Sequence, residues 1–254
     1  MIKALLVLVL LGLAFPGLTG LSAPVRGETL RIGTDARYPP FAYFTAEGRL
    51  TGFEVDLGNQ ICDSLDAVCQ WVDIPFGQLV RALRDGRIDA VMASFAITEE
   101  RRRLVAFSAK YYSTPIRFLA DRAETAPITA DSLAGRRIGV VIGTTHVDHL
   151  LRTYGPAVKP TLFETQGEML EALVAGRLDL VLADGLGLWH FLNTPQGAGF
   201  AWIGNPLYVD EGIGVAMRSG DTDLVERVDA AIDRLLRNGT FLRVNSRYFP
   251  FNIY

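Results

Sequence analysis

Three charged side chains in this sequence could together bind a small molecule that carries both a carboxylate and an amine. Arg101 stands in the first turn of a short predicted helix, where its charge opposes the helix dipole. A guanidinium that binds a carboxylate through two hydrogen bonds would explain an arginine at this position. Asp35 and Asp184 each follow an apolar run typical of a strand, where a carboxylate suits a cationic group. The alternatives are a surface arginine paired with glutamate, and aspartates that cap a turn or a helix.

The backbone of Gly143-Thr144-Thr145 is a further candidate for binding an anion, because it follows an apolar run and opens a predicted helix. Free N–H groups and the positive end of the helix dipole favour an anion there. The stretch lacks the lysine of a phosphate-binding loop, and the chain has no GxGxxG motif, so a nucleotide is disfavoured. Together with Arg101, Asp184 and Asp35, these N–H groups indicate a zwitterion with a polar or positive tail.

Three aromatic residues accompany these polar positions. Tyr38 begins the rigid turn Tyr38-Pro39-Pro40-Phe41 shortly after Asp35, where it could contact the same ligand. Phe76 and Phe95 could form walls of the binding site or belong to the hydrophobic core. The sequence leaves both interpretations open.

The elements that must position these residues occur twice in the chain. Residues 83–94, LRDGRIDAVMAS, recur as residues 173–184, LVAGRLDLVLAD, with six of twelve positions identical at a constant offset of 90. Each copy predicts an amphipathic helix that ends at a glycine, followed by a strand buried on both faces. The two strands end at Ser94 and Asp184. Independent origin of two common helix–glycine–strand units is the alternative.

A second, shorter repeat supports two similar halves. Arg31-Ile32-Gly33 and Arg137-Ile138-Gly139 each begin a predicted strand that leads into a loop and a helix. Each half is therefore predicted to be a small parallel α/β lobe. Ligands of open α/β sheets bind beyond the carboxyl ends of the strands, so facing lobes would bring Ser94 and Asp184 to one cleft.

The lobes are expected to exchange chain twice. Pro115 and Pro206 mark segments that separate the halves, and we interpret residues 112–115 and 206–212 as hinge crossings. Lobe 1 would comprise 28–113 and 213–254, and lobe 2 would comprise 115–208. The predicted strands are 29–34, 70–74, 88–93, 104–107, 114–120, 137–142, 160–163, 179–183, 200–203 and 213–217. The predicted helices are 54–65, 76–85, 99–102, 131–134, 145–154, 166–175, 185–192, 221–237 and 240–247.

Composition narrows the class of protein. Hydrophobic residues make up 49% and charged residues 21% of the 254 residues, which is typical of a globular chain. The formal charge is -3 and no basic run exceeds three arginines, so nucleic acid is not expected as a partner. The three histidines lie far from the two cysteines, and neither a metal nor a cofactor is expected.

Residues 1–23 are predicted to be a signal peptide. Lys3 is the only charge, an apolar run of 11 residues follows from Leu5, and small residues come next. The run is shorter than the about 20 residues of a membrane span, although an uncleaved anchor is the alternative. A secreted chain meets oxidising conditions, which favour a disulfide between Cys62 and Cys69 over two free thiols. Because a continuous helix would hold them about 10 Å apart, the helix must end near Leu65.

At these residues the chain resembles solute-binding protein family 3, the periplasmic amino-acid-binding proteins of ABC importers, and especially the branch that binds lysine, arginine, ornithine and histidine. The resemblance runs from about residue 28 to 254 and its cysteine spacing matches the disulfide of that branch. It rests on Arg31-Ile32-Gly33-Thr34-Asp35, Gly52-Phe53-Glu54-Val55-Asp56-Leu57, Ile97-Thr98-Glu99-Glu100-Arg101, Gly143-Thr144-Thr145, Gly239-Thr240 and Tyr248-Phe249.

The resemblance implies a two-lobed periplasmic binding protein fold of type II, a monomer, and delivery of the ligand to a membrane permease. It implies that Arg101 and the backbone at Thr145 bind the α-carboxylate. Asp184 and the region of Ser94 would bind the α-ammonium group. Asp35 would meet the ligand side chain, on which Tyr38 and Phe76 would stack.

Three positions depart from the basic-amino-acid branch. Ala93 and Ala96 stand where its members usually carry serine, and Ile142 stands where they carry glutamine. A polar neutral ligand such as glutamine is therefore an alternative to a basic amino acid. A sensor input protein is an alternative to delivery to a permease, because both roles need the same cleft. Cyclohexadienyl dehydratases share this fold, but the glutamate that this resemblance would require after residue 184 is absent, so we expect no enzyme.

Overall fold

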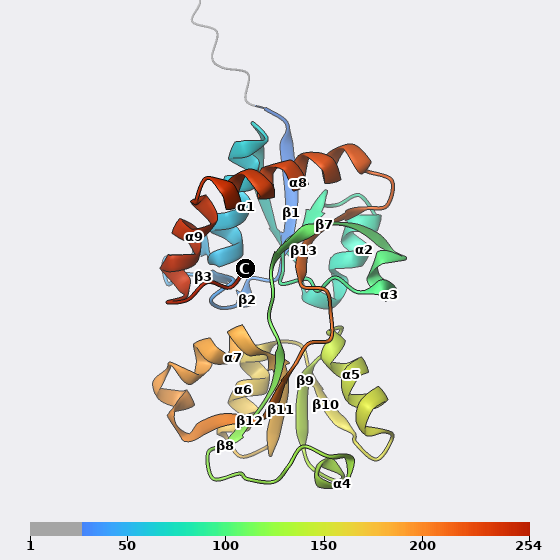
Figure 1. Ribbon diagram of the computed structural model, residues 1–254, viewed down its shortest axis with the longest axis vertical. Coiled ribbons are helices and arrows are strands. Elements are labelled where there is room, and N and C mark those ends of the chain that lie inside the picture. Colours follow the sequence, from blue (N-terminus) through green and yellow to red (C-terminus); the bar gives the residue numbers. More distant parts are fainter. Residues whose placement is uncertain (1–26) are drawn as a thin grey trace, which may run out of the picture.

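A computed structural model describes residues 27–254, which form two α/β lobes, one above the other in Figure 1. The predicted signal peptide lies outside the described residues. Within residues 27–254, no helix has the length and apolar character needed to cross a membrane.

Lobe 1 contains a five-stranded sheet with strand order β5-β1-β6-β13-β7. These strands are β1 (Thr29–Thr34), β5 (Val68–Asp73), β6 (Ala90–Val91), β7 (Val105–Tyr112) and β13 (Ile213–Arg218). Its helices are α1 (Phe53–Ser64), α2 (Leu79–Arg84), α3 (Glu99–Arg102), α8 (Thr222–Arg237) and α9 (Thr240–Tyr248). A small sheet of β2 (Arg37–Tyr38), β3 (Ala42–Phe44) and β4 (Leu50–Thr51) adjoins it. This small sheet was not predicted from the sequence.

Lobe 2 contains a second five-stranded sheet with strand order β10-β9-β11-β8-β12. Its strands are β8 (Ile116–Asp121), β9 (Ile138–Val141), β10 (Pro160–Phe163), β11 (Leu180–Asp184) and β12 (Phe200–Leu207). Its helices are α4 (Ala130–Leu133), α5 (Thr145–Tyr154), α6 (Gln166–Val174) and α7 (Gly185–Leu192). The α/β class of the fold is confirmed, but neither sheet is purely parallel. In each sheet one strand, β13 or β8, runs antiparallel to its neighbours, and it is the strand that follows a crossing between lobes.

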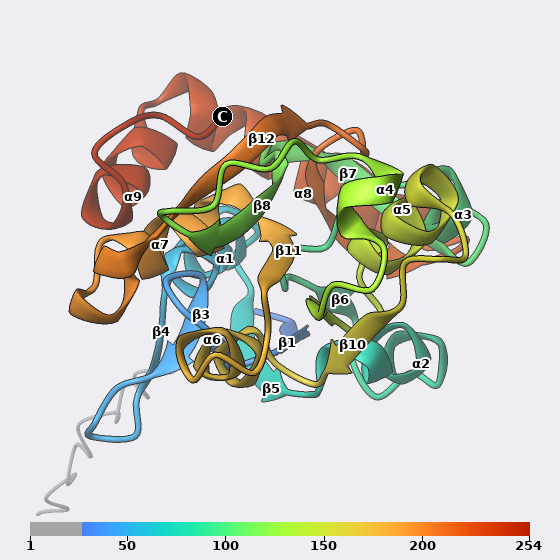
Figure 2. The ribbon, with the colours of Figure 1, turned by 90° about the horizontal axis from the view of Figure 1, so that it is seen from below.

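Successive strand residues point to opposite faces of a sheet, and in the sheet of lobe 2 both faces are buried against helices. In β11, Leu180 and Leu182 belong to the cluster with Leu150 of α5, whereas Val181 and Ala183 belong to the cluster with residues of α6. Figure 2 shows α5 and α6 on opposite sides of this sheet. The short apolar runs in the sequence therefore correspond to strands covered by helices on both faces.

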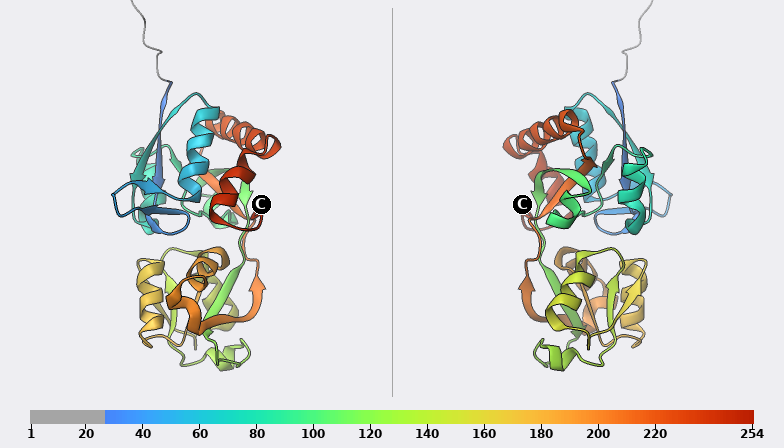
Figure 3. Two further views of the ribbon diagram at one scale, coloured as in Figure 1. Left: turned by 90° about the vertical axis from the view of Figure 1, so that its left-hand side faces the viewer. Right: turned by 90° about the vertical axis from the view of Figure 1, so that its right-hand side faces the viewer.

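The two lobes are joined by two crossings that run side by side along one edge of the molecule (Figure 3). The first lies between β7 and β8, and the second lies between β12 and β13. Register pairs join the two crossings at both ends: Ile213 pairs with Tyr112, and Leu207 pairs with Ile116. The opposite edge is left free of chain connections among the described residues.

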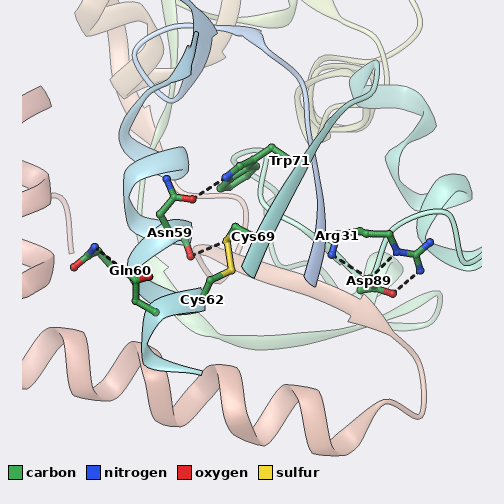
Figure 4. The surroundings of a disulfide bond; sticks show 9 residues. Arg31, Asn59, Gln60, Cys62, Cys69, Trp71 and Asp89 are labelled. Atoms are coloured by element: carbon green, nitrogen blue, oxygen red, sulfur yellow. Dashed lines mark hydrogen bonds and ion pairs between the residues drawn. A yellow bond between two sulfur atoms is a disulfide. The ribbon is translucent and has the colours of Figure 1, made fainter. Parts of the chain in front are cut away.

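The disulfide predicted between Cys62 and Cys69 is present, with a Cα–Cα distance of 5.8 Å (Figure 4). Helix α1 ends at Ser64, and Asp66 has a positive φ of 55° in the turn that leads to β5. The helix thus ends between the cysteines, as their separation requires.

Candidate ligand-binding site between the lobes

A pocket of about 60 Å³ lies between the carboxyl ends of the strands of the two lobes. Nine of the ten residues predicted to bind a ligand line it: Asp35, Tyr38, Phe76, Ser94, Ala96, Arg101, Thr144, Thr145 and Asp184. Residues that the sequence analysis did not name also line it, including Arg37, Glu54, His146, Glu164, Thr165 and Gln166. Side chains from both lobes therefore share one pocket.

Arg101 presents a guanidinium group to this pocket without an ion-pair partner among residues 27–254. Thr98 caps α3 by accepting a hydrogen bond from the Arg101 backbone N–H at 3.2 Å. The guanidinium donates to Ala96 O at 2.9 Å and, across the lobes, to Gly143 O at 3.1 Å. Burial lowers the pKa of Arg101 to about 10, opposed by the charge of Asp184. The group stays cationic at neutral pH, and the alternative of a surface ion pair with glutamate is wrong.

Phe95 does not line the pocket, so its prediction as a ligand-binding residue is wrong. Its ring is 2% exposed and stacks on Phe107 in the core of lobe 1. The guanidinium carbon of Arg101 lies 3.9 Å from the centre of the Phe95 ring. Phe95 therefore supports the guanidinium from the core through a cation–π contact. Phe76, by contrast, lines the pocket and lies near the same guanidinium.

Asp184 ends β11 and occupies the N-cap position of α7, but its side chain forms no capping hydrogen bond. The helix-cap alternative is therefore wrong. Its Oδ2 accepts a hydrogen bond from the Tyr38 hydroxyl of the other lobe at 3.2 Å. Its Oδ1 lies 3.5 Å from Nε2 of His146, which is buried in the first turn of α5. This carboxylate can accept further hydrogen bonds from a cation in the pocket.

Ser94 is held at the end of its strand segment by a buried polar network. Its backbone has a positive φ of 51°, uncommon for a residue with a side chain. The Ser94 N–H donates to Glu54 Oε2 at 2.7 Å, and Tyr112 donates to Ser94 Oγ at 2.6 Å. Glu54 also accepts a hydrogen bond from Tyr111. The network fixes an unusual backbone conformation at the floor of the pocket.

Asp35 already has partners for both of its carboxylate oxygens. Oδ1 accepts from the backbone N–H of Arg37 at 3.2 Å and from Arg37 Nε at 2.8 Å. Oδ2 accepts from Arg37 Nη2 at 2.7 Å and from the Phe76 N–H at 2.9 Å. The turn-capping alternative is therefore correct for one hydrogen bond of Asp35. The other bonds show a fork-to-fork ion pair.

The first turn of α5 lies against the pocket through Thr144 and Thr145. Thr144 is the N-cap residue, but no side chain caps the helix, and its hydroxyl donates to Val141 O at 2.7 Å instead. An α-helix leaves its first backbone N–H groups without partners inside the helix. These groups are suited to a carboxylate beside Arg101.

Two residues that the sequence analysis missed carried a signal in their helical spacing. Glu54 lies three and seven positions before the apolar Leu57 and Ile61, so an acid stands on the buried stripe of α1. His146 similarly lies four positions before Leu150 on the buried face of α5. Arg37 carried no such signal, since only its place two residues after Asp35 connects it with the site.

Two α/β lobes that are linked at one edge and share a pocket of opposite charges define a two-lobed ligand-binding protein. Residues 30–251 match the family model of bacterial extracellular solute-binding proteins, family 3. The chain belongs to this family. The resemblance noted from the sequence motifs is confirmed.

Among relatives, the chain is 39% identical to an L-arginine-binding protein of Pseudomonas aeruginosa, over 97% of this chain and 98% of that protein. It is 35% identical to the lysine/arginine/ornithine-binding periplasmic protein of Escherichia coli, over 89% of this chain and 90% of that protein. A solved structure of an ancestral arginine-binding protein bound to arginine has a TM-score of 0.83 at 29% identity, covering 88% of this chain and 99% of that chain. An ancestral arginine-binding protein bound to glutamine has a TM-score of 0.82 at 28% identity, with coverage of 89% and 99%.

Proposed function

We propose that this protein captures one basic amino acid, such as arginine, lysine, ornithine or histidine, by closing its lobes over it. The observation that carries the proposal is that two opposite charges, one from each lobe, face the same pocket. Within residues 27–254, Arg101 of lobe 1 has no anionic partner, and Asp184 of lobe 2 accepts one side-chain hydrogen bond, from Tyr38, and lies 3.5 Å from Nε2 of His146. An α-carboxylate and an α-ammonium group complete both sites.

The rest of the pocket has matching roles in this proposal. The N–H groups at Thr144 and Thr145 bind the α-carboxylate together with Arg101. Ser94 and Ala96 follow β6 (Ala90–Val91) and lie near the ammonium group in this proposal. Asp35 meets the ligand tail, on which Tyr38 and Phe76 stack.

The relatives named as binding arginine, lysine and ornithine support a basic ligand. A relative named as an ABC transporter arginine-binding protein supports a transport role. We propose that the chain is exported to the periplasm and delivers its ligand as a monomer to the permease of an ABC importer. We propose no catalysis, since Gly185 follows Asp184 and offers no acid or base there. Absence of prephenate turnover by the purified protein would agree, and measurable turnover would refute this part.

A thermal-shift screen against the twenty amino acids, ornithine and citrulline tests the ligand class. A ligand present at a hundred times its dissociation constant adds about 2.7 kcal/mol to the free energy of unfolding. For a chain of this size, we expect a rise in melting temperature of about 5–10 °C with the basic amino acids. A screen in which only neutral or acidic amino acids stabilise the protein would refute the proposed ligand class.

The role of Arg101 is tested by Arg101→Ala, measured by isothermal titration calorimetry with the best ligand of the screen. We expect affinity to fall about 100-fold or more, because the α-carboxylate would be buried without its cation. Arg102→Ala is the matched control on the same helix, since Arg102 is exposed and pairs with Glu211. Unchanged affinity in Arg101→Ala would refute the assignment.

A further inference from the structure

The acid that faces the ligand tail in the proposed function is paired with an internal cation. Arg37 supplies three of the four hydrogen bonds that Asp35 accepts, two of them from its guanidinium group. Asp35 is 8% exposed, so water reaches it little in this arrangement. A second guanidinium or ammonium group from a ligand would have to share or replace the Arg37 contacts.

Arg37 is placed so that it can leave Asp35. Its side chain is 42% exposed at the rim of the pocket. It also lines a neighbouring cavity of about 390 Å³ between the lobes. Hydrogen bonding to Asp35 raises the pKa of Arg37, and the charges of Asp73 and Glu168 add to this effect. The charges of Asp73 and Glu168 thus act on the guanidinium group, and Glu171 lines the neighbouring cavity.

We propose that Arg37 is a specificity-determining residue that competes with the cationic tail of the ligand for Asp35. This inference rests on the proposed function, and it adds that Arg37 reduces the preference of the pocket for a basic ligand. The guanidinium compensates the charge that would otherwise favour a basic amino acid over a neutral one of the same shape. A ligand gains the Asp35 contact only by sharing or replacing the Arg37 contacts.

The competition predicts that removal of the Arg37 guanidinium increases the affinity for arginine. A merely structural ion pair does not predict this increase. Arg37→Met removes the guanidinium and keeps most of the aliphatic stem. Asp35 then retains two backbone N–H donors and an uncompensated negative charge. Arginine should therefore bind more tightly to the variant, whereas citrulline, its neutral isostere, should change little.

The experiment is isothermal titration calorimetry of arginine and citrulline with the wild type and Arg37→Met. We expect the arginine-to-citrulline affinity ratio to rise about fivefold, the upper range for a half-exposed ion pair. Arg37→Lys, which keeps a charge without the planar fork, should give a smaller rise. Arg31→Met is the matched control, because Arg31 forms the same fork with Asp89 outside the pocket (Figure 4). It should leave the ratio unchanged.

A double substitution shows whether Arg37 acts through Asp35. In an Asp35→Asn background, Arg37→Met should no longer raise the ratio, because the contested charge is gone. Wild-type protein that binds no basic amino acid would refute the proposed function itself. Wild-type binding with an equal or lower ratio in Arg37→Met, or a rise that persists with Asp35→Asn, would overturn the role of Arg37 alone. Melting temperatures of each variant establish that the protein remains folded.

Discussion

Glu54 is an acid at the floor of the pocket that is completely buried. Burial raises its pKa to about 7, although hydrogen bonds from Tyr111 and Ser94 oppose the shift, and the nearby charge of Asp184 adds to it. A carboxyl group with this pKa is partly protonated at neutral pH. It can hold the Ser94 backbone in its left-handed conformation without a full charge beneath the ligand.

The raised pKa of Glu54 predicts how stability depends on pH. The folded protein binds the Glu54 proton more tightly than the unfolded chain does, so the free energy of unfolding falls as pH rises from about 4.5 to about 7. The contribution of this group is about 3 kcal/mol. Glu54→Gln removes this titrating group. We therefore expect the free energy of unfolding of the variant, relative to that of the wild type, to increase as pH rises from 5 to 8.

Urea unfolding at pH 5, 6, 7 and 8 measures this difference. Glu226→Gln, a change on the exposed face of α8, serves as the control. It should change the free energy of unfolding by the same amount at pH 5 and at pH 8. A constant difference between Glu54→Gln and wild type across the range would mean that Glu54 does not titrate there.

At the residue scale, the sequence identified the charged groups but not how they are paired. Arg101 and Asp184 could be predicted from their own segments. Arg101 stands at the start of a helix, where its charge opposes the helix dipole, and Asp184 stands at the end of an apolar strand. The pairing of Asp35 with Arg37 could not be predicted. Two opposite charges that are two residues apart can face each other or point apart, and only the local backbone conformation decides which occurs.

At the element scale, the repeat corresponds to a shared structural device. In lobe 1 the Arg31 N–H donates to Asp89 Oδ2 at 3.1 Å, and the Asp89 N–H donates to Arg31 O at 2.8 Å. In lobe 2 the same two bonds join Arg137 and Asp179, at 2.7 Å and 2.9 Å. The aspartate of each repeat thus fixes the register between its strand and the strand that begins the lobe.

The glycines of the repeat have matching geometry as well. Gly86 follows α2 with φ 71°, and Gly176 follows α6 with φ 67°, both in the left-handed region. Each terminates its helix and directs the chain into the strand that ends at the pocket. The ends of α2 and α6 were predictable because a left-handed backbone conformation after a helix favours glycine at that position. The β2–β4 sheet was not, since its two- and three-residue strands lie among proline and glycine residues that also signal turns.

The disulfide joins α1 to β5 at the end of lobe 1 that lies away from the pocket, so we expect it to act on stability alone. Replacing both cysteines, Cys62→Ala with Cys69→Ala, should cost about 2–3 kcal/mol, because the bridge closes a short loop of the unfolded chain. The melting temperature should fall by about 5–10 °C. Calorimetry should show unchanged affinity for the ligand, and a large loss of affinity would contradict this separation.

At the scale of the whole molecule, two crossings at one edge are the arrangement that the proposed closure of the lobes about a hinge requires. The lobes are in contact around the pocket in the present structure. Tyr38 contacts Asp184, and Arg101 contacts Gly143 O. Outside the pocket, Arg152 of α5 forms an ion pair with Glu100 of α3. Proline-containing segments predict the crossings from the sequence, whereas this ion pair depends on how far the lobes close, which no local pattern encodes.

The Glu100–Arg152 pair offers a test of closure that is independent of ligand chemistry. Glu100→Arg places like charges across the lobes and should shift the population toward open forms. Because it touches no ligand, it should raise the dissociation constants of all bound amino acids by one common factor of about two to five. The effect should shrink at high salt, since the pair is exposed.

Charge reversal on the partner completes this test. Adding Arg152→Glu to Glu100→Arg restores opposite charges across the lobes, so affinity should return toward the wild-type value. Glu99→Arg is the matched control, because Glu99 pairs with Arg103 inside lobe 1. This substitution makes the same change in net charge as Glu100→Arg. Small-angle X-ray scattering should show a larger radius of gyration for Glu100→Arg at subsaturating ligand and not for the double variant. If the factor differs between ligands, or if the second change fails to restore affinity, the lobes do not meet through this pair when the ligand is bound.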